Sequence, residues 1–121
     1  MSMYEGTFIG VGYILSEEER YTLFQKLWDE NNLELYNELM DDYFFRVNYE
    51  TWFFGRKAYD FNEHGEAKSI DTLVTLPLLQ DDGTFGAEIG EVLTLLGVSF
   101  EEINTKWCSP NIYVVSWQDY A

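Results

Sequence analysis

Apolar residues divide this chain into segments with the periods of strands and helices. Residues 4–15 are rich in Phe, Ile, Val and Tyr, which predicts a first strand. Ser16 follows, with Glu19 three residues later, and this capping-box pattern predicts a helix that starts here and ends near Asn31. The predicted buried face of this helix comprises Tyr21, Phe24, Leu27 and Trp28.

The Asn31-Asn32 pair interrupts the pattern, and a second helix is predicted for residues 33–43. Its apolar stripe comprises Leu33, Tyr36, Met40 and Tyr43. The aromatic segment 44–61 is predicted to be either one long bent strand or a hairpin that turns near residues 48–50. Trp52, Phe53 and Phe54 are consecutive, so at least one should face away from the core unless both sheet faces are covered.

The C-terminal half repeats the alternation of strand and helix. Residues 66–76 predict a strand, and residues 85–96 predict a helix whose periodic apolar positions are Ile89, Val92, Leu93 and Leu96. Gly97 is a predicted helix-ending residue, and Ser99 begins a short helical turn. Residues 112–117 predict the last strand.

This order of elements predicts a single α+β domain over residues 1–121, with an antiparallel sheet that has its helices packed on one face. A ferredoxin-like arrangement with one added helix is the first topology to test. No apolar segment is long enough for a membrane-spanning helix, and no secretion signal is visible at the start. A soluble protein of the cytoplasm, with no membrane partner, is therefore expected.

The charge of the chain adds information about its function. The sequence has 22 Asp and Glu residues and only 7 Lys and Arg residues, which gives a formal net charge of −15. Such a surface repels nucleic acid and acidic membranes, and it attracts basic surfaces. The charge does not signal disorder, because 46% of the residues are hydrophobic and 18% are aromatic. Solubility alone is the plainer explanation of the charge, so a structural or assembly protein stays open.

No motif identifies a reaction, so no enzyme activity, cofactor or metal site is predicted. Gly6, Gly10 and Gly12 lack the dinucleotide-binding spacing, and three glutamates occupy the helical turn where a phosphate would bind. The Asp81-Asp82-Gly83-Thr84 segment does not fit an EF-hand loop. His64 and Cys108 are single residues of their kind, with no local partner. A carboxylate-based hydrolase or a metal-binding enzyme remains the alternative from another class.

The acidic residues gather where bases are absent. At 100° per residue, four carboxylates of the second helix share one face. From residue 69 to 105 there are seven acids and no base, whereas Arg56 and Lys57 lie in the aromatic strand. The predicted partner-binding acids are Glu34, Glu38, Asp41, Asp42, Asp81, Asp82, Glu88, Glu91, Glu101 and Glu102. Trp52 is the predicted aromatic anchor, because Trp and Tyr are enriched at interface hot spots.

In size, charge and aromatic content the whole chain resembles small phage-encoded anti-defence proteins, including acidic anti-CRISPR inhibitors that mimic DNA. The resemblance rests on no shared motif, so it assigns no residue a role. It implies a basic nucleic-acid-binding partner, a CRISPR effector nuclease, blocked in the host cell cytoplasm without direct binding of nucleic acid. An immunity protein that neutralises a basic nuclease toxin would use the same electrostatics and stays open.

Overall fold

The chain alternates strands with pairs of helices. The computed structural model describes residues 3–61, 67–69 and 84–120. Its elements are β1 (Met3–Ser16), α1 (Glu17–Asp29), α2 (Leu33–Tyr43), β2 (Phe44–Arg46), β3 (Thr51–Phe61), β4 (Ala67–Ser69), α3 (Thr84–Leu95), α4 (Phe100–Lys106) and β5 (Asn111–Tyr120). The aromatic segment is therefore a β2–β3 hairpin, the second of its two predicted forms. The strand predicted for residues 66–76 corresponds to β4, and its remainder lies outside the described residues.

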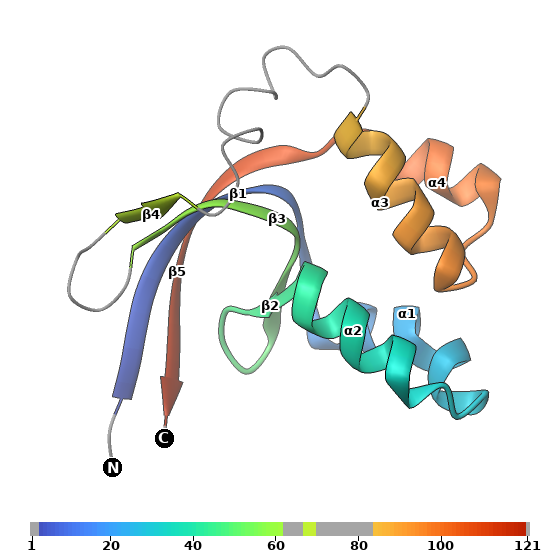
Figure 1. Ribbon diagram of the computed structural model, residues 1–121, viewed down its shortest axis with the longest axis horizontal. Helices are drawn as coiled ribbons and strands as arrows, with labels where there is room; N and C mark the ends of the chain where they lie inside the picture. Colours follow the sequence, from blue (N-terminus) through green and yellow to red (C-terminus); the bar gives the residue numbers. More distant parts are fainter. Residues whose placement is uncertain (1–2, 62–66, 70–83, 121) are drawn as a thin grey trace.

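All strand pairs are antiparallel, which confirms the predicted α+β class. The strand order is β2-β3-β1-β5. β2 pairs with the first half of β3, and β4 pairs with the end of β3. The α1–α2 pair joins β1 to β2, and the α3–α4 pair precedes β5 (Figure 1). Among the described residues, two helices lie between β1 and β2 and two lie between β4 and β5, where one added helix was expected. The ferredoxin-like label stays a prediction, and the strand order with β1 and β3 in the centre is compatible with it.

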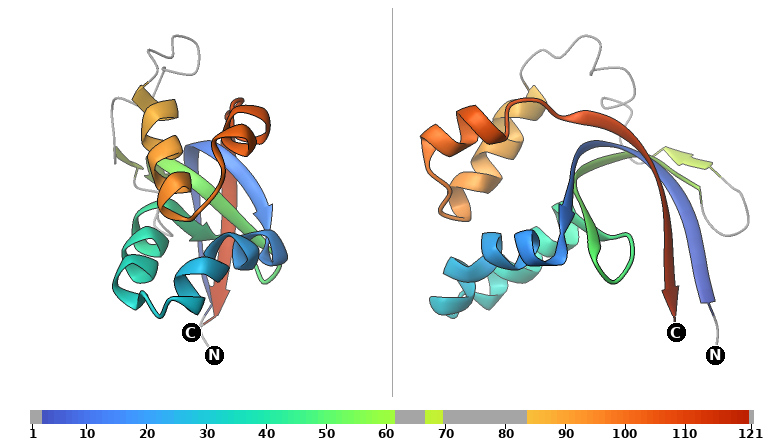
Figure 2. Two further views of the ribbon diagram at one scale, coloured as in Figure 1. Left: turned by 90° about the vertical axis from the view of Figure 1, so that its right-hand side faces the viewer. Right: turned by 180° about the vertical axis from the view of Figure 1, so that it is seen from behind.

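The two helix pairs pack on one face of the sheet, as predicted, and they lie towards one end of it (Figures 1 and 2). The core between them draws on β1, β2, β3 and all four helices. Its fully buried members are Val11, Leu15, Phe24, Leu27, Leu39, Phe44, Trp52, Phe54, Ile89, Val92, Leu93, Leu96 and Trp107. The predicted periodic positions of the third helix are all among them. This face therefore contains the main hydrophobic core.

The helix boundaries follow from local chemistry. The Ser16 hydroxyl accepts a hydrogen bond from the Glu19 amide, and the Glu19 carboxylate accepts one from the Ser16 amide, at 3.0 Å each. This capping box starts α1 as predicted. Asn31 has a positive φ of 55°, which ends α1, and the Asn32 side chain caps α2. The seven-residue α4 is longer than the single turn predicted after Ser99.

The predicted buried stripe of α1 is wrong in two positions, and that of α2 in one. Tyr21 and Trp28 are each 56% exposed, and Leu33 is 44% exposed. The buried residues of α1 are Arg20, Phe24 and Leu27. The centre of this face lies about 90° from the position of Tyr21 and about 70° from that of Trp28, at 100° per residue. The face was misplaced because a buried arginine was not anticipated.

The opposite face of the sheet has a smaller aromatic cluster of its own. Phe8, Phe53 and Val115 are buried there, and the partly buried Phe45, Val47, Tyr113 and Trp117 pack around them. The Phe8 and Phe53 rings meet edge to face, with centroids 5.1 Å apart. The sheet arches strongly along β1 and β3 (Figure 1), so this face is in part covered by its own side chains. Three consecutive aromatic residues of β3 are therefore all buried.

Two glycine sites in β1 permit this arrangement. Gly12 lies opposite Gly55 of β3, which has a positive φ of 155°, and a Cβ on either would collide with the carbonyl oxygen across the strand pair. A Cβ at Gly10 would lie 2.6 Å from the Phe53 ring. The β1–β3 register also shifts between Ile9 and Gly10, and such bulges bend strands. Close packing therefore explains these glycines.

We predict that Gly12→Ala and Gly55→Ala each destabilise the protein by more than about 2 kcal/mol, because the new methyl group meets backbone that cannot move aside. Gly86→Ala is the matched control, since Gly86 lies in α3 and a Cβ there would have open space for 4 Å around it. Alanine there should be neutral or stabilise by up to about 1 kcal/mol. Urea unfolding of the three variants measures this. Equal stability of all three would contradict the packing role of the glycine pair.

Candidate partner-binding surface

One face of α2 is built from carboxylates. Glu34, Glu38, Asp41 and Asp42 are all exposed, as predicted. They fall within about 100° around the helix, at 100° per residue. The opposite side of α2 buries Leu39 and packs Leu35, Tyr36, Met40 and Tyr43 against the core. We call Glu34, Glu38, Asp41 and Asp42 the α2 acidic face.

The position of two of these acids opposes helix stability. Asp41 and Asp42 lie in the last turn of α2, where the helix dipole is negative and where no basic residue occurs. An acid at such an end costs about 0.3–1 kcal/mol when it is exposed. By contrast, the first turn of α1 contains Glu17, Glu18 and Glu19, where the dipole favours them. Solubility alone does not require acids at the unfavourable end of α2.

The second predicted acidic block is divided by the structure. Glu91 in α3 and Glu101 and Glu102 in α4 are exposed. Glu88 differs, because its side chain is only 27% exposed and its carboxylate has two partners within the fold. Asp81 and Asp82 lie outside the described residues. Three acids of this block are therefore available on the helix surfaces, and Glu88 has a structural role.

Glu88 connects three elements. The Arg56 guanidinium of β3 pairs with its Oε2 at 2.9 Å, and the Tyr43 hydroxyl at the end of α2 donates to its Oε1 at 2.8 Å. Burial, followed by the hydrogen bond to this carboxylate, raises the pKa of Tyr43 to about 12. The hydroxyl therefore stays protonated and keeps donating at neutral pH. This bridge fixes the C-terminal end of α2 against α3 and the sheet.

The acids and bases are not as separate in space as the sequence predicted. Arg56 and Lys57 line a shallow hollow of about 410 Å³ together with Asp41, Asp42 and Glu88. The sequence places these bases far from the acids, but the β2–β3 hairpin returns β3 to the end of α2. The C-terminal end of the α2 acidic face therefore has positive charge nearby, and its N-terminal part, with Glu34 and Glu38, is the more isolated.

Most bases of the chain contact groups within the fold. Six of the seven Lys and Arg residues have described side chains, and each has an acidic or aromatic partner. The contacts are Arg20 with Glu17, Arg46 with Glu17 and Trp52, Lys26 with Glu30, Arg56 with Glu88, Lys57 with Phe8 and Phe45, and Lys106 with Trp107. No ion pair among the described residues includes the α2 acidic face.

Trp52 is not the exposed anchor that the sequence predicted. Its side chain is 6% exposed, because its ring faces the helices while Phe53 enters the opposite cluster. The prediction failed because both faces of β3 are covered. The Trp52 ring lies between two guanidinium groups, with Arg20 5.0 Å and Arg46 4.5 Å from its centroid. Its indole N–H donates to the Glu17 carboxylate.

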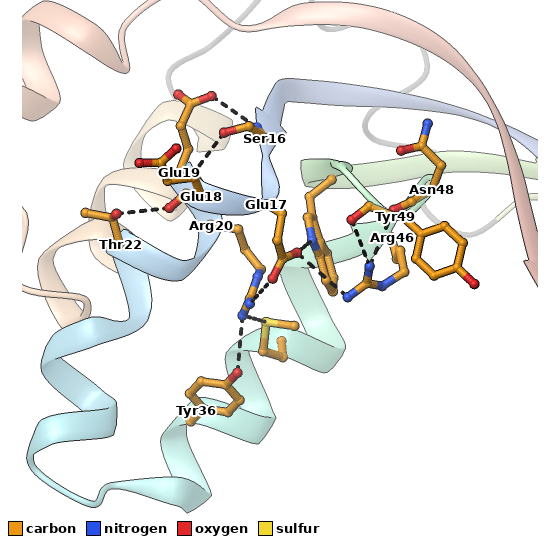
Figure 3. Close-up of polar contacts among 12 residues, drawn as sticks. Ser16, Glu17, Glu18, Glu19, Arg20, Thr22, Tyr36, Arg46, Asn48 and Tyr49 are labelled. Atoms are coloured by element: carbon orange, nitrogen blue, oxygen red, sulfur yellow. Dashed lines mark hydrogen bonds and ion pairs between the residues drawn. The ribbon is translucent and has the colours of Figure 1, made fainter.

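Glu17 is the centre of this polar cluster (Figure 3). Its Oε1 pairs with Arg20 at 2.6 Å, and its Oε2 lies 3.7 Å from Arg46 on the hairpin. Arg20 also donates to the Tyr36 hydroxyl of α2 at 3.2 Å. Partial burial alone would raise the pKa of Glu17, but the bonds from Arg20 and Trp52 outweigh it and lower that pKa. The cluster therefore fixes α1, α2 and the hairpin relative to one another.

Several apolar side chains lie exposed on the helices, and two of them, Trp28 and Leu33, were predicted to be buried. Leu33 precedes Glu34 at the start of α2, and Trp28 of α1 lies 6.0 Å from the Tyr36 ring between centroids. Phe100, at the start of α4, is 80% exposed beside Glu101. For α1, a face centred on Arg20, Phe24 and Leu27 leaves Tyr21 and Trp28 outside, so a buried position at Arg20 would have placed both aromatic residues on the surface.

Comparisons with protein-family models, curated proteins and solved structures found no match to this chain. Over the described residues, no group of three or more His, Cys, Asp or Glu side chains is placed to hold a metal ion. None of the helices in that part of the chain has the length and apolar content to cross a membrane. The surface features above therefore provide the basis for a functional proposal.

We predict that Glu17→Gln lowers the free energy of unfolding at pH 7 by about 1–2 kcal/mol, because it leaves Arg20 without its carboxylate. The folded-state pKa of Glu17 is depressed, so its contribution is present above the usual value of 4.5 and is lost as pH falls through the lowered pKa. The difference between variant and wild type should therefore shrink below about pH 4.

The control for this experiment is Glu18→Gln, which removes an adjacent exposed carboxylate from the same helical turn. It should change stability by less than about 0.5 kcal/mol. Urea unfolding at pH 7 and pH 3 provides the four comparisons. A Glu17→Gln difference that persists unchanged at pH 3 would show that the ionised cluster is not its cause.

Proposed function

We propose that this protein is a non-catalytic acidic inhibitor that binds the basic nucleic-acid-binding surface of a partner protein. Its most specific form is an anti-CRISPR blocker of a CRISPR effector nuclease, acting in the cytoplasm of a host cell. The single observation behind the proposal is the α2 acidic face, whose four exposed carboxylates are in no ion pair among the described residues. A positive channel for phosphates is complementary to such a face.

The spacing of the carboxylates supports phosphate mimicry. Glu34 to Asp42 spans about 12 Å along the axis, at ~1.5 Å per residue. Four charges over this length give roughly one charge per 4 Å, near the ~3.4 Å between phosphates along one DNA strand. The mean axial spacing of the charges along α2 is therefore close to the phosphate spacing that a DNA-binding channel accommodates, while the single steps of ~6, ~4.5 and ~1.5 Å are uneven.

Charge and apolar contact have separate roles in this proposal. The net charge of −15 steers the protein to a basic partner and sets the association rate. Leu33, which directly precedes Glu34 and is 44% exposed, supplies the apolar contact that slows dissociation. It takes the anchoring role that Trp52 cannot have. Glu91, Glu101 and Glu102 extend the acidic surface onto the second helix pair.

An immunity protein directed at a basic nuclease toxin would use the same surface, so the choice of target decides between the two. The purified chain should be titrated against a CRISPR effector nuclease and against a basic nuclease toxin in the same buffer series. Inhibition of the effector alone supports the anti-CRISPR form, and inhibition of the toxin alone supports the immunity form. Binding to neither, at low salt, would overturn the proposal.

We predict that the quadruple variant Glu34→Gln, Glu38→Gln, Asp41→Asn and Asp42→Asn binds its target about 10- to 100-fold more weakly, because four charge contacts are lost. The same variant should be at least as stable as wild type, since removing two acids from the last turn of α2 relieves the dipole. Calorimetric titration and urea unfolding measure the two effects. Binding of wild type should also weaken as salt rises.

A variant with the same total charge separates location from net charge. Glu18→Gln, Asp29→Asn, Glu30→Gln and Glu50→Gln also change four exposed carboxylates, on α1 and the hairpin turn. This control should keep its affinity within about threefold of wild type, because only long-range steering is reduced. Equal losses in the two quadruple variants would mean that bulk charge, and not the α2 acidic face, governs binding.

A further inference from the structure

The strand β5 forms one edge of the sheet. It pairs with β1 over its whole length, from Asn111 opposite Gly12 to Tyr120 opposite Met3. No other strand of the described residues pairs with its outer side (Figures 1 and 2). An unpaired edge presents a row of backbone donors and acceptors that can template another strand. At ten residues, β5 is long for an edge strand.

Within the described part of the chain, this edge lacks the usual protections against pairing. Proteins protect edge strands with lysines, prolines, bulges or very short strands. β5 contains no Lys, Arg or Pro and a single acid, Asp119, in a chain with 22 acids. The opposite edge is different, since β2 has only three residues and includes Arg46. β5 is therefore the part of the sheet where a second strand meets the least electrostatic opposition.

Exposed apolar side chains lie along the same strand. Val114 is 70% exposed and Ile112 is 48% exposed. Both share the helix-bearing face of the sheet with their β1 partners Ile9 and Val11. The helix pairs pack at one end of this face, and Val114 remains uncovered among the described side chains. An edge whose outer backbone groups pair with no described strand, together with an exposed valine, is typical of a strand-pairing interface.

We propose that β5 pairs with β5 of a second copy of this chain, antiparallel and about a two-fold axis. A two-fold axis makes the same patch serve both partners, which suits a self-complementary, uncharged edge. With the axis at Val114, each Ile112 would lie opposite Ser116 of the other copy. The two sheets then become one continuous sheet, and the α2 acidic faces stay outside the interface.

Charge identifies the second copy as the occupant. Two chains of net charge −15 repel each other, so they can associate only through a surface from which acids are absent. β1 and β5 each contain one acid, whereas the exposed acids described above lie on the helices and the hairpin turn. Screening of the remaining repulsion strengthens this pairing as salt rises. This proposal does not rest on the proposed inhibitor function.

Sedimentation equilibrium at 0.05 M and 0.5 M NaCl tests the pairing. Wild type should be dimeric, with a dissociation constant lower by about tenfold or more at high salt. Val114→Lys should be monomeric, because two lysines would face each other across the axis. Phe100→Lys, which removes a more exposed apolar residue from α4, should dimerise at least as well as wild type, since it lowers the net negative charge.

The direction of the salt effect separates this proposal from the inhibitor proposal, since partner binding weakens with salt and self-pairing strengthens. A wild-type chain that stays monomeric at millimolar concentration in 0.5 M NaCl would overturn the pairing, as would a Val114→Lys dimer. If Val114→Lys fails to fold, amide exchange of wild type decides the question. Exchange in β5 should slow as protein concentration rises, and exchange that is independent of concentration would overturn the proposal.

Discussion

The burial of three consecutive aromatic residues in β3 is the constraint on which the rest of the structure depends. Side chains alternate across a strand, so Phe53 must enter the face opposite to Trp52 and Phe54. Both faces can be covered only because the sheet arches and packs part of one face against itself. The Gly12–Gly55 pair and the bulge beside Gly10 permit that arch. All the helices are then placed on the other face.

The placement of the helices determines where charge is exposed. The Glu17 cluster holds α1, α2 and the hairpin together, and the Arg56–Glu88–Tyr43 bridge holds the far end of α2. In both clusters, arginine side chains pair with a glutamate of the same chain. These contacts use several of the few bases within the fold, and no ion pair among the described residues includes the α2 acidic face. The contacts that stabilise the fold thus also leave fewer bases to offset the negative charge of its surface.

The elements that local chemistry determines could be predicted from the sequence. The capping box at Ser16, the asparagines before α2 and the period of α3 set the helix boundaries, and each depends on residues close in the chain. The features that the sequence did not predict depend largely on contacts between distant residues. Arg20 is buried where its terminal nitrogens donate to the nearby Glu17 and to Tyr36 of α2, and Glu88 is paired because the hairpin returns Arg56 to α2. Trp52 could not be placed without knowing that both sheet faces are covered.

If the α2 acidic face occupies a site built for phosphates, it must compete with DNA for that site. Competition is measured most directly with labelled duplex DNA bound to the target nuclease, to which the protein is added at rising concentration. We expect wild type to displace the DNA fully, with an apparent affinity that falls in proportion to the DNA concentration. A ternary complex, in which the target holds DNA and inhibitor together, would contradict phosphate mimicry.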